Sequence, residues 1–331
     1  MSPKIGVLGA GAWGTALAIM LASDGRRVLL WAREPELVEE INSSHTNSLY
    51  LPPANLPDTI EATGDLSRMA SLDILLVVTP AQHTGAVLAQ RREWPRDLVL
   101  CSKGIEASSG RLMNDVARRE AVGSEIAVLS GPTFAHEVAA GLPTAVTLAC
   151  GGGEAQWERL SQAIARPAFR PYYSDDVVGA EIGGAVKNVL AIACGVIDGL
   201  SLGQNARAAL IARGYAEMLR FGEALGARAE TLAGLCGLGD LVLTCSSTSS
   251  RNFSLGKAIG EGRRASDLMQ DRRTVAEGAH TAPVLVELAA RHGVSMPIVN
   301  AVYHLLQGDT PGEVVERLLA RPLSAEAGTA D

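Results

Sequence analysis

The first half of the chain alternates between short apolar runs and longer stretches in which apolar residues recur at helical spacing. Buried strands of a parallel sheet read as continuous apolar runs of about four to eight residues. Such runs predict strands at residues 4–9, 72–78, 97–102, 126–130, 144–150 and 169–174, and one more within 24–33. Helical patterns, the first over 12–23, separate most of them. This alternation predicts an α/β domain with a mostly parallel, doubly wound sheet.

The pattern changes after Asp176. The β-branched strand runs stop there, and long segments rich in Ala, Leu and Gly follow. Apolar segments of this length at helical spacing are typical of buried helices. We therefore predict a domain boundary near residue 176, with the sheet domain at 1–176 and an all-helical domain at 177–331.

Composition and charge limit the kinds of partner that we expect these domains to bind. The 331 residues are 47% hydrophobic but 4% aromatic, which indicates an aliphatic core. A formal net charge of −7 argues against a nucleic-acid-binding surface. Five cysteines without CxxC spacing predict reduced structural thiols, no metal site and a cytoplasmic location. Because the start lacks a signal peptide and no uncharged apolar run approaches 18 residues, we expect no membrane association.

A glycine motif follows the first predicted strand. In "GAGAWG", Gly9, Gly11 and Gly14 fill the G-x-G-x-x-G template at the mouth of a helix. The first glycine permits a tight turn, the second lets the backbone approach a pyrophosphate, and the third lets the helix pack on the strand. Free amides at the helix start favour phosphate. The placement predicts dinucleotide binding, and the alternative is a structural turn.

Arg33 and Glu34 end the second predicted strand, in "LLWAREPE". An NAD-specific protein often has an acid there for the ribose hydroxyls, whereas an arginine can bind the 2′-phosphate of NADPH. Arg33 lies 19 residues after Gly14 and predicts that NADPH is accepted. The alternative is a solvated arginine at a helix start, and Glu34 leaves exclusive use of NADP open. The expected cofactor is therefore NADPH/NADP or NADH/NAD.

Three other segments carry candidate chemistry. Lys103 leaves an inner strand at the edge where ligands of open α/β sheets bind; the alternative is a surface lysine. In "LSGPTFAHEVA", Thr133 is placed to start a helix whose amides could face a ligand, unless this is an ordinary capped turn. Asp240 lies in a glycine-rich bend, and the Ser/Thr-rich loop after it ends in Arg251 and Asn252, which suits phosphate. A solvated loop explains the serines but not an apolar-flanked aspartate.

Lys187 and Asn188 interrupt the apolar run "EIGGAVKNVLAIACGVIDG". An unpartnered buried lysine favours its neutral form, so this side chain either reaches solvent or has a function. On a helix, Lys187 shares one side with Ala191 and Cys194, whose small side chains leave room for a ligand.

Together, these motifs carry a family resemblance. The chain resembles the NAD(P)-dependent glycerol-3-phosphate dehydrogenases of the bacterial type through "GAGAWGTALA", "SKGIE", "SGPTFAHEVA", the Lys187 run, "NARAALIARG", "GLGDLVLTC", "SRN" and "VAEG". The match runs nearly end to end. It implies a Rossmann-type domain followed by an all-helical domain, and reversible hydride transfer between NAD(P)H and dihydroxyacetone phosphate to give sn-glycerol 3-phosphate for phospholipid synthesis.

The resemblance also implies roles for single residues. Lys187 would donate and accept the proton, with Lys103 and Asp240 beside it as catalytic residues. Substrate binding is assigned to Lys103, Gly131, Thr133, Lys187, Asn188, Asp240, Ser250, Arg251 and Asn252. Cofactor binding, with the glycine motif, is assigned to Gly9, Gly11, Ala12, Trp13, Gly14, Arg33, Lys103, Ala135, Arg251, Val275 and Glu277.

Two departures and two alternatives accompany the resemblance. Ala12 occupies a position where relatives often carry serine, and Trp13 one where some carry tyrosine; neither changes the expected chemistry. The alternatives are another β-hydroxy-acid or 6-phosphogluconate-type dehydrogenase, and a non-catalytic NAD(P)-binding redox sensor. The expected partners are the small-molecule substrate and, in a homodimer, a second copy of the chain.

Overall fold

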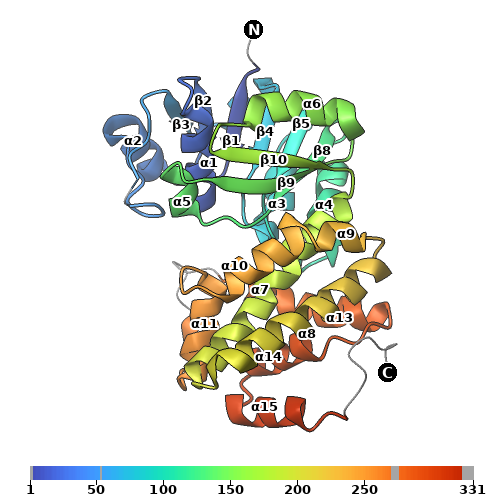
Figure 1. The fold of residues 1–331 in the computed structure, drawn as a ribbon. Helices are drawn as coiled ribbons and strands as arrows, with labels where there is room; N and C mark the ends of the chain where they lie inside the picture. The colour runs from blue at the N-terminus through green and yellow to red at the C-terminus, as the bar shows by residue number, and fades with distance from the viewer. Residues whose placement is uncertain (1–2, 53, 270–275, 323–331) are drawn as a thin grey trace. The chain divides into compact units, whose positions relative to one another are not determined.

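A computed structural model describes residues 3–52, 54–269 and 276–322 (Figure 1). Contacts divide the chain into two compact units, one formed by Met1–Lys103 with Arg111–Ala180 and the other by Gly104–Gly110 with Glu181–Asp331. The segment Gly104–Gly110 therefore belongs to the second unit, although it precedes Arg111–Ala180 of the first. A single boundary near residue 176 does not describe this arrangement.

The first unit is built on an eight-stranded sheet of order β10-β9-β8-β5-β4-β1-β2-β3. Every neighbouring pair is parallel except β8 and β9, which are antiparallel. The predicted mostly parallel sheet is confirmed. The strands are β1 (Ile5–Leu8), β2 (Val28–Trp31), β3 (Ile60–Thr63), β4 (Ile74–Val77), β5 (Asp97–Leu100), β8 (Glu125–Ser130), β9 (Thr144–Cys150) and β10 (Phe169–Ser174).

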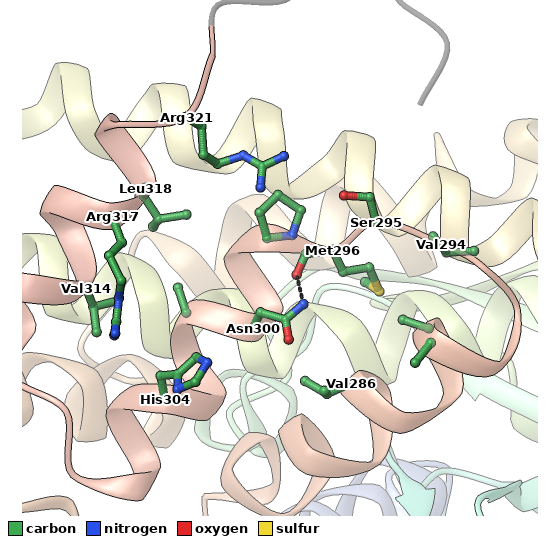
Figure 2. A pocket seen from close by; sticks show the side chains of 14 residues that line it. Val286, Val294, Ser295, Met296, Asn300, His304, Val314, Arg317, Leu318 and Arg321 are labelled. Carbon is green, nitrogen blue, oxygen red and sulfur yellow. Dashed lines mark hydrogen bonds between the residues drawn. The ribbon is translucent and has the colours of Figure 1, made fainter. Parts of the chain in front are cut away.

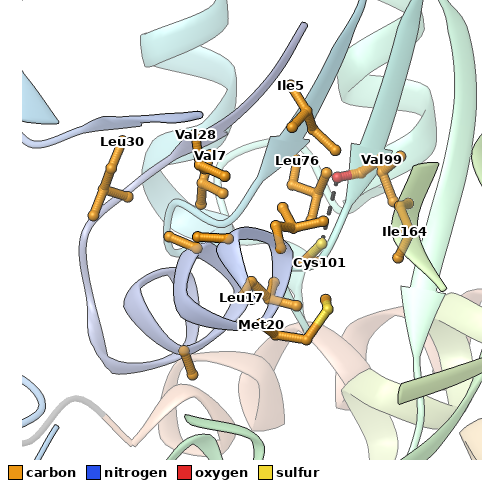
Figure 3. Packing of buried hydrophobic residues seen from close by; sticks show 14 of the residues in the cluster. Ile5, Val7, Leu17, Met20, Val28, Leu30, Leu76, Val99, Cys101 and Ile164 are labelled. Atoms are coloured by element: carbon orange, nitrogen blue, oxygen red, sulfur yellow. Dashed lines mark hydrogen bonds between the residues drawn. The ribbon is translucent and has the colours of Figure 1, made fainter. Parts of the chain in front are cut away.

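The core of this unit lies where the first helix packs on the sheet. Leu17 and Met20 of that helix lie against strand residues such as Leu76 and Val99, and Cys101 lies beside them (Figure 3). The helices of the unit are α1 (Ala12–Ala22), α2 (Pro35–Ser44), the 3-10 helix η1 (Leu66–Ser71), α3 (Ala81–Leu88), α4 (Met113–Glu120), α5 (Ala135–Ala139) and α6 (Gly153–Ile164). The predicted helix over 12–23 is confirmed.

The sequence pattern did not predict three of the strands. β3 is an edge strand that alternates buried Ile60, exposed Glu61 and buried Ala62. Because Glu and Ala favour strands weakly, so short a segment carries little strand signal. The other two, β6 (Ile105–Glu106) and β7 (Arg111–Leu112), are two residues long and lie outside the large sheet.

The second unit is helical in every regular element from Glu181 to Pro322, apart from residues 270–275, which the structure does not describe. Its long helix α7 (Val177–Gly199) is apolar enough to cross a membrane, with a mean hydropathy of 1.5 over 18 residues, but all of these residues are buried. The other helices are α8 (Gly203–Ala224), α9 (Ala229–Leu232), the π-helical turn η2 (Leu235–Gly239), α10 (Asp240–Cys245), α11 (Arg251–Gly260), α12 (Ala265–Met269), α13 (Glu277–Arg291), α14 (Pro297–Gln307) and α15 (Pro311–Leu319).

Candidate active site

The glycine motif forms a tight turn between β1 and α1. Gly9 has a φ of +120°, which favours glycine, and a Cβ on Gly14 would lie 1.8 Å from the Gly9 carbonyl oxygen. A Cβ on Gly11 would meet no atom within 4 Å, and Gly11 starts α1 without a side-chain cap. The turn therefore needs Gly9 and Gly14 for its own packing, while Gly11 leaves open space beside the first amides of the helix.

Ala12 and Trp13 form the first turn of α1 beside this open space. The indole Nε1 of Trp13 is buried, and no hydrogen-bond acceptor for it is found among the described residues. A buried donor without a partner costs free energy, so this group favours a bound acceptor. The turn and its indole thus fit a polar ligand such as a dinucleotide.

Lys103 lies just beyond the end of β5. Its Nζ donates hydrogen bonds to the Gly131 carbonyl oxygen at 2.9 Å and to Thr133 Oγ1 at 3.3 Å. A Cβ on Gly131 would lie 2.9 Å from the Val146 Cα, so β9 passes too close for a larger residue. The structure therefore brings together three of the predicted substrate residues of the first unit.

Thr133 does not start α5, and that prediction is wrong. The helix starts at Ala135 with Phe134 in the capping position, where no side chain caps it. The Thr133 hydroxyl instead donates to the Gly131 carbonyl oxygen at 3.3 Å and accepts from Lys103. The Thr133 hydroxyl thus bonds to the Lys103 ammonium and the Gly131 carbonyl oxygen instead of to the helix amides.

Lys187 lies on α7 and forms a buried ion pair with Asp240, the first residue of α10. Its Nζ lies 2.8 Å from Asp240 Oδ1 and 2.8 Å from Thr244 Oγ1. Only 7% of the lysine side chain and 0% of the aspartate side chain are exposed. The Thr244 hydroxyl in turn donates to Asp240 Oδ1 at 3.2 Å. The carboxylate stabilises a charged ammonium that burial alone would disfavour.

Thr244 is a site residue that the sequence analysis missed. It follows Asp240 by one helical turn, at i+4, so both side chains lie on the same face of α10. The run "GLGDLVLTC" could have indicated Thr244, because a helix that starts at Asp240 places residue 244 on the same face.

Close backbone contacts position Asp240. A Cβ on Gly183 would lie 2.4 Å from the Cys236 carbonyl oxygen, and one on Gly237 would lie 1.9 Å from the Leu232 carbonyl oxygen. The turn η2 therefore packs directly on the backbone of α7, and Asp240 follows it at once.

Asn188 and Asn252 belong to a buried hydrogen-bond relay. Asn252 Nδ2 donates to Asn188 Oδ1 at 2.9 Å, and Asn252 Oδ1 accepts from the Gly278 N–H at 2.9 Å. A Cβ on Gly278 would lie 2.5 Å from the Asn188 carbonyl oxygen. The relay ties α7 to the starts of α11 and α13.

Ser250 and Arg251 begin α11. The Ser250 hydroxyl caps the helix by accepting from the Phe253 N–H at 3.2 Å, and Arg251 is exposed. A Cβ on Gly256 would lie 1.9 Å from the Ile192 carbonyl oxygen, and one on Gly195 would lie 2.0 Å from that of Phe253. Helices α7 and α11 are thus in backbone contact, which fixes the start of α11, where Arg251 lies, relative to α7.

The five cysteines are all buried as free thiols. Cys194 and Cys245 contact each other, and burial first, then this contact, raises the pKa of the Cys245 thiol. A thiol with a raised pKa is a poor nucleophile, so Cys245 acts as small apolar packing. Within the described ranges, no group of three His, Cys, Asp or Glu residues could hold a metal ion.

Two remaining features lie apart from these clusters. Glu277 starts α13, beside the relay residue Gly278, whereas Val275 lies outside the described residues. A cavity of about 470 Å³ opens between α13, α14 and α15, with Asn300, His304 and Arg321 among its polar lining (Figure 2). None of the predicted site residues lines it.

Comparisons with known proteins give a consistent result. Residues 4–156 match the family model of the NAD-dependent glycerol-3-phosphate dehydrogenase N-terminus, and residues 176–316 match that of the C-terminus. A glycerol-3-phosphate dehydrogenase, NAD(P)+, of Erythrobacter litoralis is 74% identical over 98% of each chain. One from Novosphingobium aromaticivorans is 70% identical over 98% of this chain and 99% of its own. The crystal structure of a Coxiella burnetii glycerol-3-phosphate dehydrogenase has a TM-score of 0.91 at 39% identity, covering 97% of this chain and 99% of that one.

Proposed function

Because this chain belongs to the NAD-dependent glycerol-3-phosphate dehydrogenase family, we propose that Lys187 is the residue that exchanges a proton with its substrate. The chain is an NAD(P)-dependent oxidoreductase that interconverts dihydroxyacetone phosphate and sn-glycerol 3-phosphate, which feeds phospholipid synthesis. The observation that carries the assignment is the buried ion pair of Lys187 and Asp240.

The first unit fits the cofactor at the glycine motif. Gly11 leaves open space at the start of α1, and the unsatisfied Trp13 Nε1 offers a donor beside it. The nicotinamide of the bound cofactor supplies or accepts the hydride. We assign binding of the rest of the cofactor to Gly9, Gly11, Ala12, Trp13, Gly14, Arg33, Lys103, Ala135, Arg251, Val275 and Glu277.

Lys187 is prepared for the proton step by its two neighbours. Reduction of the ketone places negative charge on its oxygen, and an ammonium both stabilises that charge and delivers the proton. Asp240 and Thr244 accept two of the three ammonium hydrogens, which orients the group and keeps it charged. In the reverse reaction, the neutral amine accepts the proton from the alcohol.

We assign the substrate phosphate to the start of α11. Arg251 is exposed there and can pair with a phosphate through two hydrogen bonds, and the free amides of the helix start add to the attraction. We assign Asn252 to the phosphate as well, because its Nδ2 carries two hydrogens and the bond to Asn188 uses one of them. Lys103, held by Gly131 and Thr133, is assigned to the substrate as a second ammonium.

One assay tests the function against its alternatives. Purified protein is mixed with NADH or NADPH and dihydroxyacetone phosphate, and the absorbance of the reduced cofactor is followed. We expect oxidation that depends on this ketone. A redox sensor would bind the cofactor without turnover, and a dehydrogenase of another substrate class would require a different carbonyl compound.

We also propose a cytoplasmic enzyme that binds neither membranes nor nucleic acid. The net charge of −7 and the burial of α7 support this proposal. The homodimer stays a prediction, which sedimentation velocity would check.

A further inference from the structure

The cavity between α13, α14 and α15 lies within the second unit and is lined mainly by apolar side chains. Its volume of about 470 Å³ is typical of small-molecule pockets, which range from about 300 to 1,000 Å³. Fourteen described residues line it, and none of these is acidic. The polar ones are Ser295, Asn300, His304, Arg317 and Arg321. The lining is therefore cationic, although the whole chain carries a net charge of −7.

The charged and the apolar side chains lie on different sides of this cavity. Arg317 is in the last turn of α15, and the N–H of Arg321 bonds to the Leu318 carbonyl oxygen at 3.4 Å, which continues that turn. The two arginine side chains lie on the α15 side, whereas Val286 and Val294 lie across from them (Figure 2). A ligand that fits this arrangement has one charged end and one apolar end.

The two arginines differ in their partners. Arg317 forms an ion pair with Asp309, and the same carboxylate lies 3.6 Å from His304 Nδ1. Arg321 is exposed and forms no ion pair within the described part of the chain. A guanidinium presents parallel N–H donors that match the two oxygens of a carboxylate. Arg321 therefore leaves a place for one carboxylate at the edge of an apolar cavity.

We propose that this cavity binds an aliphatic carboxylate, with the carboxylate on the Arg321 guanidinium and the chain against the apolar side. The chain removes apolar surface of both partners from water, and charge-assisted hydrogen bonds hold the charged end. Because the lining holds cationic groups and no acid, charge complementarity favours an anion over a neutral alcohol of the same length. None of the residues assigned to the substrate or the cofactor lines the cavity, so this site is separate from the proposed active site.

Titration calorimetry of the full chain with octanoate and with 1-octanol, at one fixed ionic strength, tests the proposal. Octanoate should bind about 3- to 10-fold more tightly than octanol, and each methylene added between hexanoate and decanoate should lower the Kd by about 2- to 4-fold. In Arg321→Gln, octanoate should bind about 3- to 10-fold more weakly, while octanol changes less than about 2-fold. The matched control is Arg263→Gln, which removes an exposed arginine of the same unit outside the cavity and should change neither Kd.

A second variant, Ala290→Trp, tests whether the chain of the ligand occupies the cavity. Ala290 is exposed on α13 and lines the cavity, so an indole there fills part of the space at little cost to folding. Octanoate and octanol should both bind at least about 10-fold more weakly, because the apolar surface that they cover is already covered. The urea midpoint of unfolding and the turnover of dihydroxyacetone phosphate should equal those of the parent, which separates this test from that of the proposed function.

Several results would overturn the proposal. Unchanged binding of octanoate in Ala290→Trp or in Arg321→Gln would place the ligand elsewhere. Tighter binding of octyl phosphate than of octanoate would assign the charged end to a phosphate. Tighter binding of octanoate after deletion of residues 323–331, or loss of a dimer in Ala290→Trp by sedimentation velocity, would show that the chain itself covers the cavity.

Discussion

Lys187 and Asp240 are joined across two helices by a 2.8 Å contact from which water is almost entirely excluded. Neither charge is stable alone in such a place, since an isolated buried ion favours its neutral form. The pair therefore stabilises a buried ammonium, which the proton step that we propose for Lys187 requires.

Replacing Lys187 with alanine should lower kcat by about 10²- to 10⁴-fold, the usual range for a positioned acid or base. The dissociation constant of the cofactor should barely change, because the lysine acts on the substrate. Steady-state kinetics and cofactor titration measure the two quantities. Full activity in this variant would remove the proposed role.

This variant needs a folding control, because it leaves Asp240 buried without its partner. Breaking a buried ion pair costs about 3–5 kcal/mol of stability. The double variant Lys187→Met with Asp240→Asn removes both charges, so it should unfold at higher urea concentration than Lys187→Ala while remaining inactive. Activity in the double variant would contradict the assignment.

Replacing Thr244 with valine removes one hydroxyl while keeping the shape of the side chain. The hydroxyl accepts from Lys187 and donates to Asp240, so its loss should lower kcat by about 5- to 30-fold, equivalent to about 1–2 kcal/mol. Thr244→Ser keeps the hydroxyl and should retain most activity. Equal activity of the valine and serine variants would show that the hydroxyl has no part in orienting the ammonium.

Replacing Arg251 with alanine should lower kcat/KM for dihydroxyacetone phosphate by about 10²-fold or more, since a charge-assisted contact in the transition state is lost. Unphosphorylated dihydroxyacetone should be affected far less. The ratio of kcat/KM for the two ketones is the measurement. If the variant keeps the preference of the parent for the phosphorylated ketone, the phosphate is bound elsewhere.

Replacing Glu217 with glutamine should change how stability depends on pH. Glu217 is buried, and its carboxylate accepts from the N–H groups of Ile298 and Val299 at 2.7 and 3.2 Å. Burial raises its pKa from 4.5 to about 7 in the folded protein, although these hydrogen bonds lower it. The folded state therefore binds more protons than the unfolded state between these values, and the contribution of Glu217 to stability falls as pH rises from 4.5 to 7.

The difference in the free energy of unfolding between the variant and the parent isolates the contribution of Glu217. From pH 5 to pH 8, the free energy of unfolding of Glu217→Gln should rise relative to the parent by about 2 to 4 kcal/mol, because glutamine does not titrate. Urea unfolding at both pH values measures it. A constant difference would mean that Glu217 titrates near its ordinary value.

The fold could be predicted where local signals agreed with tertiary structure. Continuous apolar runs predicted β4, β5 and β8, and the glycine motif predicted the start of α1, because burial on both faces of the sheet imposes the composition of each strand. β3 could not be predicted, since an edge strand is buried on fewer sides and its composition is less constrained.

The sequence could indicate single candidate residues of the site, but not the contacts between them. Lys187 and Asp240 could both be proposed from the polarity of each within an apolar segment. The contact between them depends on how η2 packs on α7, which no local pattern encodes. The prediction that Thr133 starts a helix was wrong for the same reason. Its hydroxyl donates to the Gly131 carbonyl oxygen, whose position depends on how the turn after β8 folds.

The backbone contact between α7 and α11 holds the two helices at one spacing. Gly195 and Gly256 each face a carbonyl oxygen of the other helix, and a carbonyl cannot rotate aside as a side chain can. The spacing of the two helix backbones that carry Lys187 and Arg251 is thus set by main chain rather than by side chains. The helices that carry the proposed proton carrier, Lys187, and the proposed phosphate anchor, Arg251, therefore have no freedom to move closer together.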